Sequence, residues 1–196
     1  MNKFKFLLVL IFSLEIYSLN YKPNIIIILT DDLGWGDVSY NSGSISTPNI
    51  DKLAKDGLLM NRFYSAPTCS PTRASLMTGI NSIKNGVVRP INNPIAERNA
   101  LPLRHKIMPE YFKEAGYQTA LSGKWHLGMF SDEYLPGNRG FDYTYGHLGG
   151  GIDYFEHTLS GRLDWHRNAE VLYEDGYSTT LIADAVSYTH LTLPTI

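Results

Sequence analysis

The feature that most constrains the fold is a run of four isoleucines between Asn24 and Leu29, inside the segment 23–29. Every residue of the run is β-branched and apolar. If the chain is extended there, apolar side chains lie on both of its faces, and both faces must be buried. Such a segment is typical of a central strand in a parallel sheet that helices cover on both sides. The sequence therefore predicts an α/β architecture in which residues 23–29 form a buried strand.

Helix and strand signals alternate along the rest of the chain. The predicted elements, in chain order, are a helix from Pro48 to Gly57 with Thr47 as its N-cap, a strand over 58–64, a short helix around Pro71 that ends at Thr78 and Gly79, a helix over 108–115 that ends at Gly116, and a strand over 117–121. This order predicts one α/β domain with a largely parallel central sheet covered by helices on both faces.

Composition and charge limit the classes of function. The chain has 196 residues, of which 43% are hydrophobic, which is enough for one domain with a sizeable core. Its net charge is -2, and its lysines and arginines are scattered rather than grouped in runs. A protein that binds nucleic acid needs a basic face, so we expect no nucleic-acid partner.

The N-terminus has the pattern of an export signal. Lys3 and Lys5 precede an apolar stretch over 6–14, which has the length of a signal-peptide core and is too short to span a bilayer. We predict that residues 1–18 are a signal peptide, with the small Ser18 just before the cut. The chain then meets a membrane only during export, and its expected location is periplasmic, secreted or lysosomal, depending on the organism. A retained membrane anchor is the alternative.

Cys69 is the only cysteine of the chain, so no intramolecular disulfide is possible. It is therefore either a reactive or modified residue or a small buried apolar one. Pro71 suits the first turn of a helix, whose peptide N–H groups then point back towards residue 69. Arg73 adds a permanent positive charge one turn away. Together these features favour an anion site around Cys69.

Polar residues also follow two of the predicted strands, where α/β proteins place their ligands. Asp31 and Asp32 come directly after the isoleucine segment. Their charges repel each other unless a cation lies between them, and carboxylate oxygens suit Ca²⁺ or Mg²⁺. Lys124 and His126 follow the strand over 117–121 and, two apart in an extended stretch, are expected to point the same way. A simple turn, a surface lysine and a packed histidine are the alternatives.

Two segments resemble the signatures of a known enzyme family. Residues 69–79, CSPTRASLMTG, resemble the signature of the type I sulfatases, and residues 116–126, GYQTALSGKWH, resemble the second signature of that family. The resemblance implies an alkaline-phosphatase-like fold and the oxidation of Cys69 to formylglycine by a formylglycine-generating enzyme. It also implies that Asp31, Asp32 and the modified Cys69 are ligands of Ca²⁺, with Mg²⁺ possible.

The same resemblance implies a sulfuric ester hydrolase and a specific catalytic role for each of these residues. One hydroxyl of the formylglycine hydrate attacks sulfur, while Arg73 and Lys124 offset charge on the sulfate oxygens. The second hydroxyl is then deprotonated by His126, so that sulfate is expelled and the aldehyde returns. Lys124 is in this interpretation both a catalytic and a substrate-binding residue.

The stretch from Pro136 to Tyr154 resembles the arylsulfatase B group of that family, so the implied substrate is a sulfated carbohydrate or an aryl sulfate. His147 lies in this stretch among aromatic residues and is interpreted as a substrate-binding residue that lines a sugar pocket. His157 and His166 are weighed for the same role. The alternative for all three is that they are ordinary loop or surface residues, and His105 is interpreted as a structural or surface residue.

The resemblance covers residues 22–185, which are interpreted as the N-terminal part of a sulfatase catalytic domain. Residues 186–196 resemble a translated sequencing-adapter tail and are predicted not to be native. An Asp-Asn pair of metal ligands and a later histidine and lysine of the family are absent, so the chain as given is expected to be inactive. The remaining alternatives are a formylglycine-dependent phosphonate monoester or phosphodiester hydrolase of the same superfamily, and a non-catalytic exported binding protein.

Overall fold

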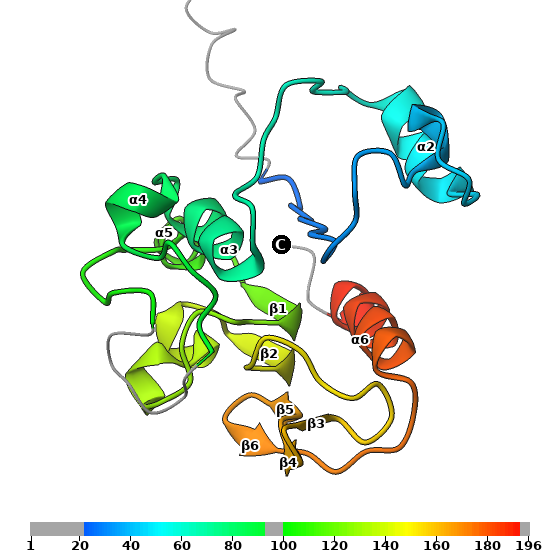
Figure 1. Cartoon of the computed structure of the whole chain (residues 1–196). Coiled ribbons are helices and arrows are strands. Elements are labelled where there is room, and N and C mark those ends of the chain that lie inside the picture. The colour runs from blue at the N-terminus through cyan, green and yellow to red at the C-terminus, as the bar shows by residue number, and fades with distance from the viewer. Residues whose placement is uncertain (1–21, 93–99, 193–196) are drawn as a thin grey trace, which may run out of the picture. The chain divides into compact units, whose positions relative to one another are not determined.

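The computed structural model describes residues 22–92 and 100–192 (Figure 1). They fall into two units that meet after Gly34 in the sequence, and each unit is described by itself. The predicted signal peptide over 1–18 lies outside the described residues. Among the helices of the described part, none has the length and apolar character that a membrane crossing would require.

In the first unit the isoleucine segment is extended, but it is not a strand. Its backbone belongs to no ladder among the described residues, and the exposed fractions of side chains 25–29 run from 39% to 77%. The prediction of a buried strand over 23–29 is therefore wrong for this structure. β-branched residues favour an extended backbone locally, but only a hydrogen-bonded neighbour makes that backbone a strand. Asp31 and Asp32 follow in a bend, where Asp32 has a φ of 55°.

The second unit is built on a small mixed sheet. Its strands, in the order in which they pair, are β1 (Ala120–Lys124), β2 (Tyr143–His147), β5 (His166–Arg167) and β6 (Glu170–Val171), and a separate hairpin joins β3 (Thr158–Leu159) to β4 (Arg162–Leu163). β1 and β2 are parallel, whereas β2, β5 and β6 pair antiparallel. The parallel register sets Lys124 opposite His147 at the carboxyl ends of β1 and β2.

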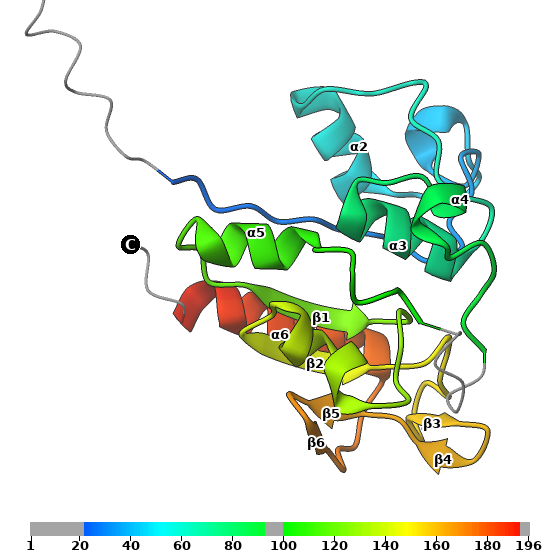
Figure 2. The same ribbon diagram turned by 90° about the vertical axis from the view of Figure 1, so that its left-hand side faces the viewer.

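Helices lie on both sides of the parallel pair (Figure 2). The α-helices of the described residues are α2 (Pro48–Asp56), α3 (Cys69–Thr78), α4 (Ser82–Asn85), α5 (Met108–Glu114) and α6 (Ser178–Thr192), and the 3-10 turns are η1 (Ser39–Asn41), η2 (Asp132–Tyr134) and η3 (Pro136–Arg139). On one side α6 packs on β1 and β2, and Ser122 Oγ donates to Ile182 O over 3.0 Å. On the other side Leu121 packs against the core that α3 and α5 help to enclose.

The predicted helices are confirmed, with one change in how they begin. α2 begins at Pro48 and ends before Gly57, and α3 ends at Gly79 with a φ of 67°. Thr47 precedes α2 as expected, but its hydroxyl does not cap the helix. Instead Thr47 Oγ1 donates to the side chain of Asp51 over 2.9 Å.

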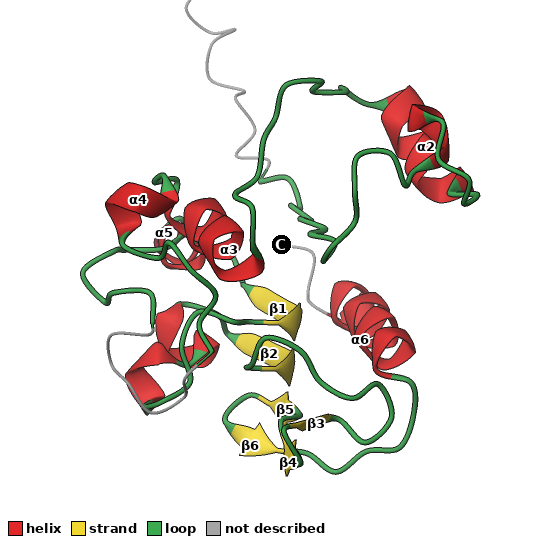
Figure 3. Ribbon diagram, in the orientation of Figure 1, coloured by secondary structure: helices red, strands yellow, loops and turns green. Residues whose placement is uncertain are grey.

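Two further strand predictions need correction (Figure 3). Residues 58–64 form no strand among the described residues, and Leu58 and Tyr64 are 89% and 84% exposed, because nothing pairs with this apolar stretch. The strand predicted over 117–121 begins later, at Ala120. Thr119 delays it, because its N–H donates to Asp142 Oδ2 over 3.0 Å rather than to a neighbouring strand.

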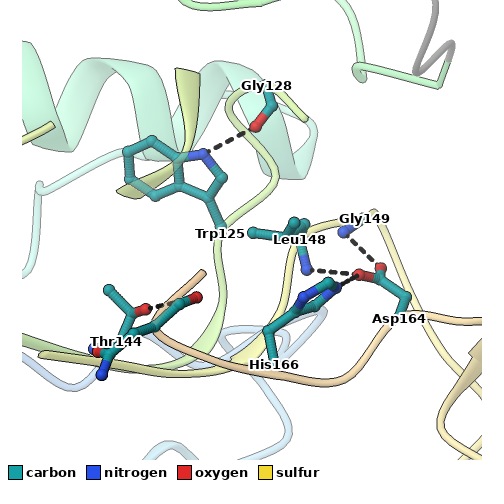
Figure 4. Close-up of polar contacts among 8 residues, drawn as sticks. Trp125, Gly128, Thr144, Leu148, Gly149, Asp164 and His166 are labelled. Atoms are coloured by element: carbon teal, nitrogen blue, oxygen red, sulfur yellow. Dashed lines mark hydrogen bonds and ion pairs between the residues drawn. The ribbon is translucent and has the colours of Figure 1, made fainter. Parts of the chain in front are cut away.

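The core of the second unit is centred on Trp125, which is 1% exposed. The buried residues that form this core are Ala74, Val87, Leu101, Ile107, Trp125, Leu127 and Phe141. The indole Nε1 of Trp125 donates to Gly128 O over 3.0 Å (Figure 4). It also donates to Tyr134 O over 3.0 Å. A fully buried and hydrogen-bonded indole thus holds the chain directly between Lys124 and His126.

The predicted boundary of the adapter-like tail falls inside a helix. α6 runs from Ser178 to Thr192 without a break, so the step from residue 185 to residue 186 leaves no trace in the backbone. Residues 193–196 lie outside the described residues. The assignment of 186–196 as a tail that is not native stays a prediction.

Candidate functional site

The first turn of α3 carries the residue singled out by the sequence. Cys69 is the first helical residue and is half-buried, and Pro71 lies in the same turn, as predicted. Thr72 Oγ1 donates to Ala66 O over 2.9 Å, which fastens the loop before the helix. Peptide N–H groups of this turn have no carbonyl acceptor within the helix, so they favour negative charge near residue 69.

Arg73 connects this turn to the sheet. The side chain is 9% exposed, and its Nη1 donates to Lys124 O over 2.6 Å. The helix that begins at Cys69 is thereby held against the carboxyl end of β1. The structure thus brings Arg73 and Lys124 together, as the sequence predicted from two motifs that are 51 residues apart.

His147 lies near Lys124 and Arg73 at the same edge of the sheet. It is 9% exposed and pairs in register with Lys124. Burial, together with the positive charges of Lys124 and Arg73, lowers the pKa of His147 to about 4, against a smaller raising effect of Asp164. At neutral pH His147 is therefore an uncharged imidazole beside two permanent cations.

His126 is linked to the start of α3 by hydrogen bonds, but its backbone conformation differs from the one that the sequence predicted. β1 ends at Lys124, and His126 has a φ of 56°, so the premise of an extended stretch through both residues is wrong. The ring is 2% exposed, and its Nε2 forms a hydrogen bond of 3.0 Å with Ile91 O. The N–H of Ile91 in turn donates over 3.0 Å to Ser70 Oγ, next to Cys69.

Asp164 is a site residue that sequence reasoning missed. It is 3% exposed and accepts hydrogen bonds from Leu148 N (3.0 Å), Gly149 N (2.7 Å) and His166 Nε2 (3.0 Å), as Figure 4 shows. Burial by itself raises the pKa of Asp164, but these three hydrogen bonds outweigh it and lower the pKa below its ordinary value. The available signal was the glycine run over 149–151, which marks a backbone that other groups approach closely.

The other histidines of this stretch serve packing. His157 is 1% exposed, stacks on Trp165 with ring centroids 4.5 Å apart, and forms a hydrogen bond with Gly176 O. His166 is bound to Asp164. Both rings are thus held within the fold, and their weighed role in a sugar pocket stays a prediction.

The predicted metal ligands divide between the two units. Asp31 and Asp32 belong to the first unit and Cys69 to the second, so the structure does not place them relative to each other. Within the described residues, no group of three or more His, Cys, Asp or Glu side chains is close enough to hold a metal ion. Two adjacent carboxylates are the oxygen donors that Ca²⁺ and Mg²⁺ take, but Ca²⁺ usually has about six to eight such ligands. Asp31 and Asp32 therefore fit a part of such a site.

The buried, neutral His147 predicts a loss of stability in mild acid. The pKa of His147 is about 4 in the folded chain and 6.5 in the unfolded chain, where the imidazole is exposed to water. Between these two pH values the unfolded chain binds a proton that the folded chain does not. The free energy of unfolding should therefore fall as the pH drops from 6.5 towards 4, by roughly 3 kcal/mol in total. Urea unfolding at several pH values measures this slope. His147→Gln should make the slope shallower, and an unchanged slope would contradict a buried neutral His147.

The chain is similar to known proteins over most of its length. The sequence profile of the family described as Sulfatase matches residues 23–188. Mouse arylsulfatase J is 41% identical over 136 residues, which are 69% of this chain and 23% of that protein. The crystal structure of Ps i-CgsB superposes with a TM-score of 0.76 at 34% identity, covering 87% of this chain and 42% of that one.

A further solved structure, BT4656 in complex with its substrate D-glucosamine-2-N,6-O-disulfate, has a TM-score of 0.71 at 29% identity and covers 89% of this chain and 32% of that one. The chain thus spans about a quarter of the length of the curated relative named above. Its fold is that of the alkaline-phosphatase-like sulfatases, of which the described residues form a partial domain. With a family match over most of its length, the chain belongs to the sulfatase family.

Proposed function

We propose that the whole protein hydrolyses sulfate esters, with Cys69 converted to formylglycine as its nucleophile. One observation carries this proposal: the guanidinium of Arg73, one turn after Cys69 in α3, donates to the backbone carbonyl of Lys124 at the end of β1. Two permanent cations and the N-terminal turn of a helix are suited to the oxygens of a sulfate group. The site also has a half-buried residue 69 from which a nucleophile can reach that group.

The proposed reaction has two displacement steps. In the first, an oxygen of the formylglycine hydrate forms a bond to sulfur, and the bond from sulfur to the ester oxygen breaks, so the alcohol leaves with a proton. In the second, a base removes the proton of the other hydroxyl, the C=O bond forms, and the bond between carbon and the sulfate oxygen breaks. Water then adds to the aldehyde and restores the hydrate.

Residues of this chain have distinct tasks in these steps. Arg73 and Lys124 bind the sulfate oxygens and offset the charge that develops on them. His126 removes the proton in the second step, as its hydrogen-bonded link to Ser70 beside Cys69 supports. A divalent cation held in part by Asp31 and Asp32, Ca²⁺ or alternatively Mg²⁺, would supply further positive charge for the oxygens of residue 69 and of the sulfate.

The proposed substrate is a sulfated sugar, with His147 among the residues that contact it. BT4656, which resembles this chain, was solved with a sulfated glucosamine as its substrate. We further propose that the protein is exported after removal of residues 1–18, because that segment has the pattern of a signal peptide.

A comparison of two ester classes tests the proposal. The whole protein, produced together with a formylglycine-generating enzyme, is assayed with a sulfated sugar or an aryl sulfate and with a phosphodiester of the same leaving group. We expect turnover of the sulfate ester, and we expect Cys69→Ala to abolish it. A preference for the phosphodiester, or no turnover when residue 69 is fully converted, would overturn the proposal.

A further inference from the structure

Three consecutive glycines, 149–151, lie shortly after β2, and two of them are closely approached by other side chains. A Cβ atom on Gly149 would lie 2.8 Å from Asp164 Oδ2 and 2.4 Å from Leu159 Cδ2. A Cβ atom on Gly150 would lie 2.8 Å from both Cε1 and Nε2 of His126. Gly149 therefore lies against Asp164 and Gly150 lies against His126, with no room for a side chain on either glycine.

Hydrogen bonds run through the same segment. Asp164 accepts from the N–H groups of Leu148 and Gly149, and the carbonyl of Leu148 accepts from His126 N over 3.0 Å. One carboxylate thus orients the peptide that in turn holds the backbone of His126. His166 donates to the same carboxylate from the β5 side, so the position of Asp164 is itself fixed.

The contacts continue from His126 to the start of α3. The ring Nε2 forms a hydrogen bond with Ile91 O, and Ile91 N donates to Ser70 Oγ. Ser70 is 0% exposed and directly follows Cys69. Hydrogen bonds linked through the residues His126 and Ile91 therefore connect Asp164 to the neighbour of residue 69.

We propose that Asp164 is a positioning residue of the site, which acts through residues 148–150 to fix the imidazole of His126 relative to residue 69. The role of His126 in proton removal rests on the proposed function above, whereas the positioning itself does not. A buried carboxylate suits this task, because it accepts several N–H bonds at once and is stabilised in its charged form by them.

A pair of neighbouring glycines gives the sharpest test. Gly150→Ala places a methyl group against the His126 ring, whereas a methyl group on Gly151 would meet nothing within 4 Å. The readout is the side-chain ¹⁵N spectrum of the histidines in the chain, with the His126 signals assigned from a His126→Gln variant. We expect Gly150→Ala to move the His126 signals and Gly151→Ala to leave them in place. Equal spectra for the two variants would overturn the proposal.

A second variant tests the carboxylate itself. Asp164→Asn keeps the shape of the side chain but replaces one acceptor oxygen by an NH₂ group, so either Gly149 N loses its acceptor, or Leu148 N and His166 lose theirs. We expect the His126 signals to shift and, in the whole protein, kcat to fall at least about 10-fold with little change in KM. Asp142→Asn is the control, since Asp142 also accepts a backbone bond, from Thr119 N, but at the start of β2.

The two proposals fail in different ways. His126 signals that shift in Asp164→Asn and Gly150→Ala support positioning even if no sulfate ester is turned over. His126 signals that stay in place in both variants overturn the positioning role even if the protein is an active sulfatase. A fall of kcat in Asp142→Asn as large as that in Asp164→Asn would show a general loss of structure and would likewise overturn it.

Discussion

Replacing Arg73 by alanine is expected to lower turnover of a sulfate ester by the whole protein at least about 100-fold. The guanidinium is buried, holds Lys124 through its carbonyl and supplies one of the two cations beside residue 69. The alanine variant lacks the positive charge that stabilises the negative charge developing on the sulfate oxygens. It also leaves the carbonyl of Lys124 without this hydrogen-bond donor. Steady-state kinetics with a sulfated sugar, expressed per chain that carries formylglycine at residue 69, measure the effect, and Arg73→Lys should recover only part of the activity because lysine lacks the planar fork.

Arg139 provides the matched control. It is also buried, at 3% exposed, and donates to the backbone carbonyls of Leu101 and His105. Burial lowers the pKa of Arg139, against the raising effect of Glu110. Arg139→Ala should therefore destabilise the fold without a specific loss of turnover in the protein that remains folded. A similar loss of turnover in both variants would mean that Arg73 serves packing alone.

Replacing Trp125 by alanine is expected to lower the free energy of unfolding of the second unit by about 3–5 kcal/mol. The indole fills the centre of the core, packs edge-on against Phe141, and bonds two carbonyls that would then lose their donor. Because Trp125 lies between Lys124 and His126, the same change should loosen both side chains. Urea unfolding followed by circular dichroism measures the loss.

Trp35 is the control for this change, since its side chain is 76% exposed. Trp35→Ala should alter the free energy of unfolding by no more than about 0.5 kcal/mol. A loss of less than about 1 kcal/mol in Trp125→Ala would contradict the placement of the indole at the centre of the core.

The parts of the site that local chemistry determines were predictable from the sequence. A proline in the first turn and a glycine after the last one defined α3 around Cys69, and the structure confirms both ends. The meeting of Arg73 with Lys124 was implied by the resemblance of their two motifs to the sulfatase signatures. The ends of α3 thus needed only turn chemistry, whereas the pairing of the two motifs needed the family resemblance.

The remaining features depend on contacts between distant residues. The isoleucine segment lacks a paired neighbour among the described residues, and no local pattern reveals that. The left-handed backbone of His126 goes with its bond to Leu148, which follows another strand. Asp164 is a single carboxylate outside both motifs, and only the pairing of β2 with β5 brings it to residues 148 and 149.

The most direct test of the site concerns residue 69 itself. The chain is produced with a formylglycine-generating enzyme, and the tryptic peptide 63–73, which contains the only cysteine, is measured by mass spectrometry. A matched variant, Pro71→Ala combined with Arg73→Ala, removes two residues of the motif and should abolish conversion; its cysteine lies in the longer tryptic peptide 63–84, because residue 73 is no longer a cleavage site. We expect the peptide of the unaltered chain to carry an aldehyde at residue 69. A thiol at full occupancy would contradict a formylglycine nucleophile and would favour a non-catalytic binding protein.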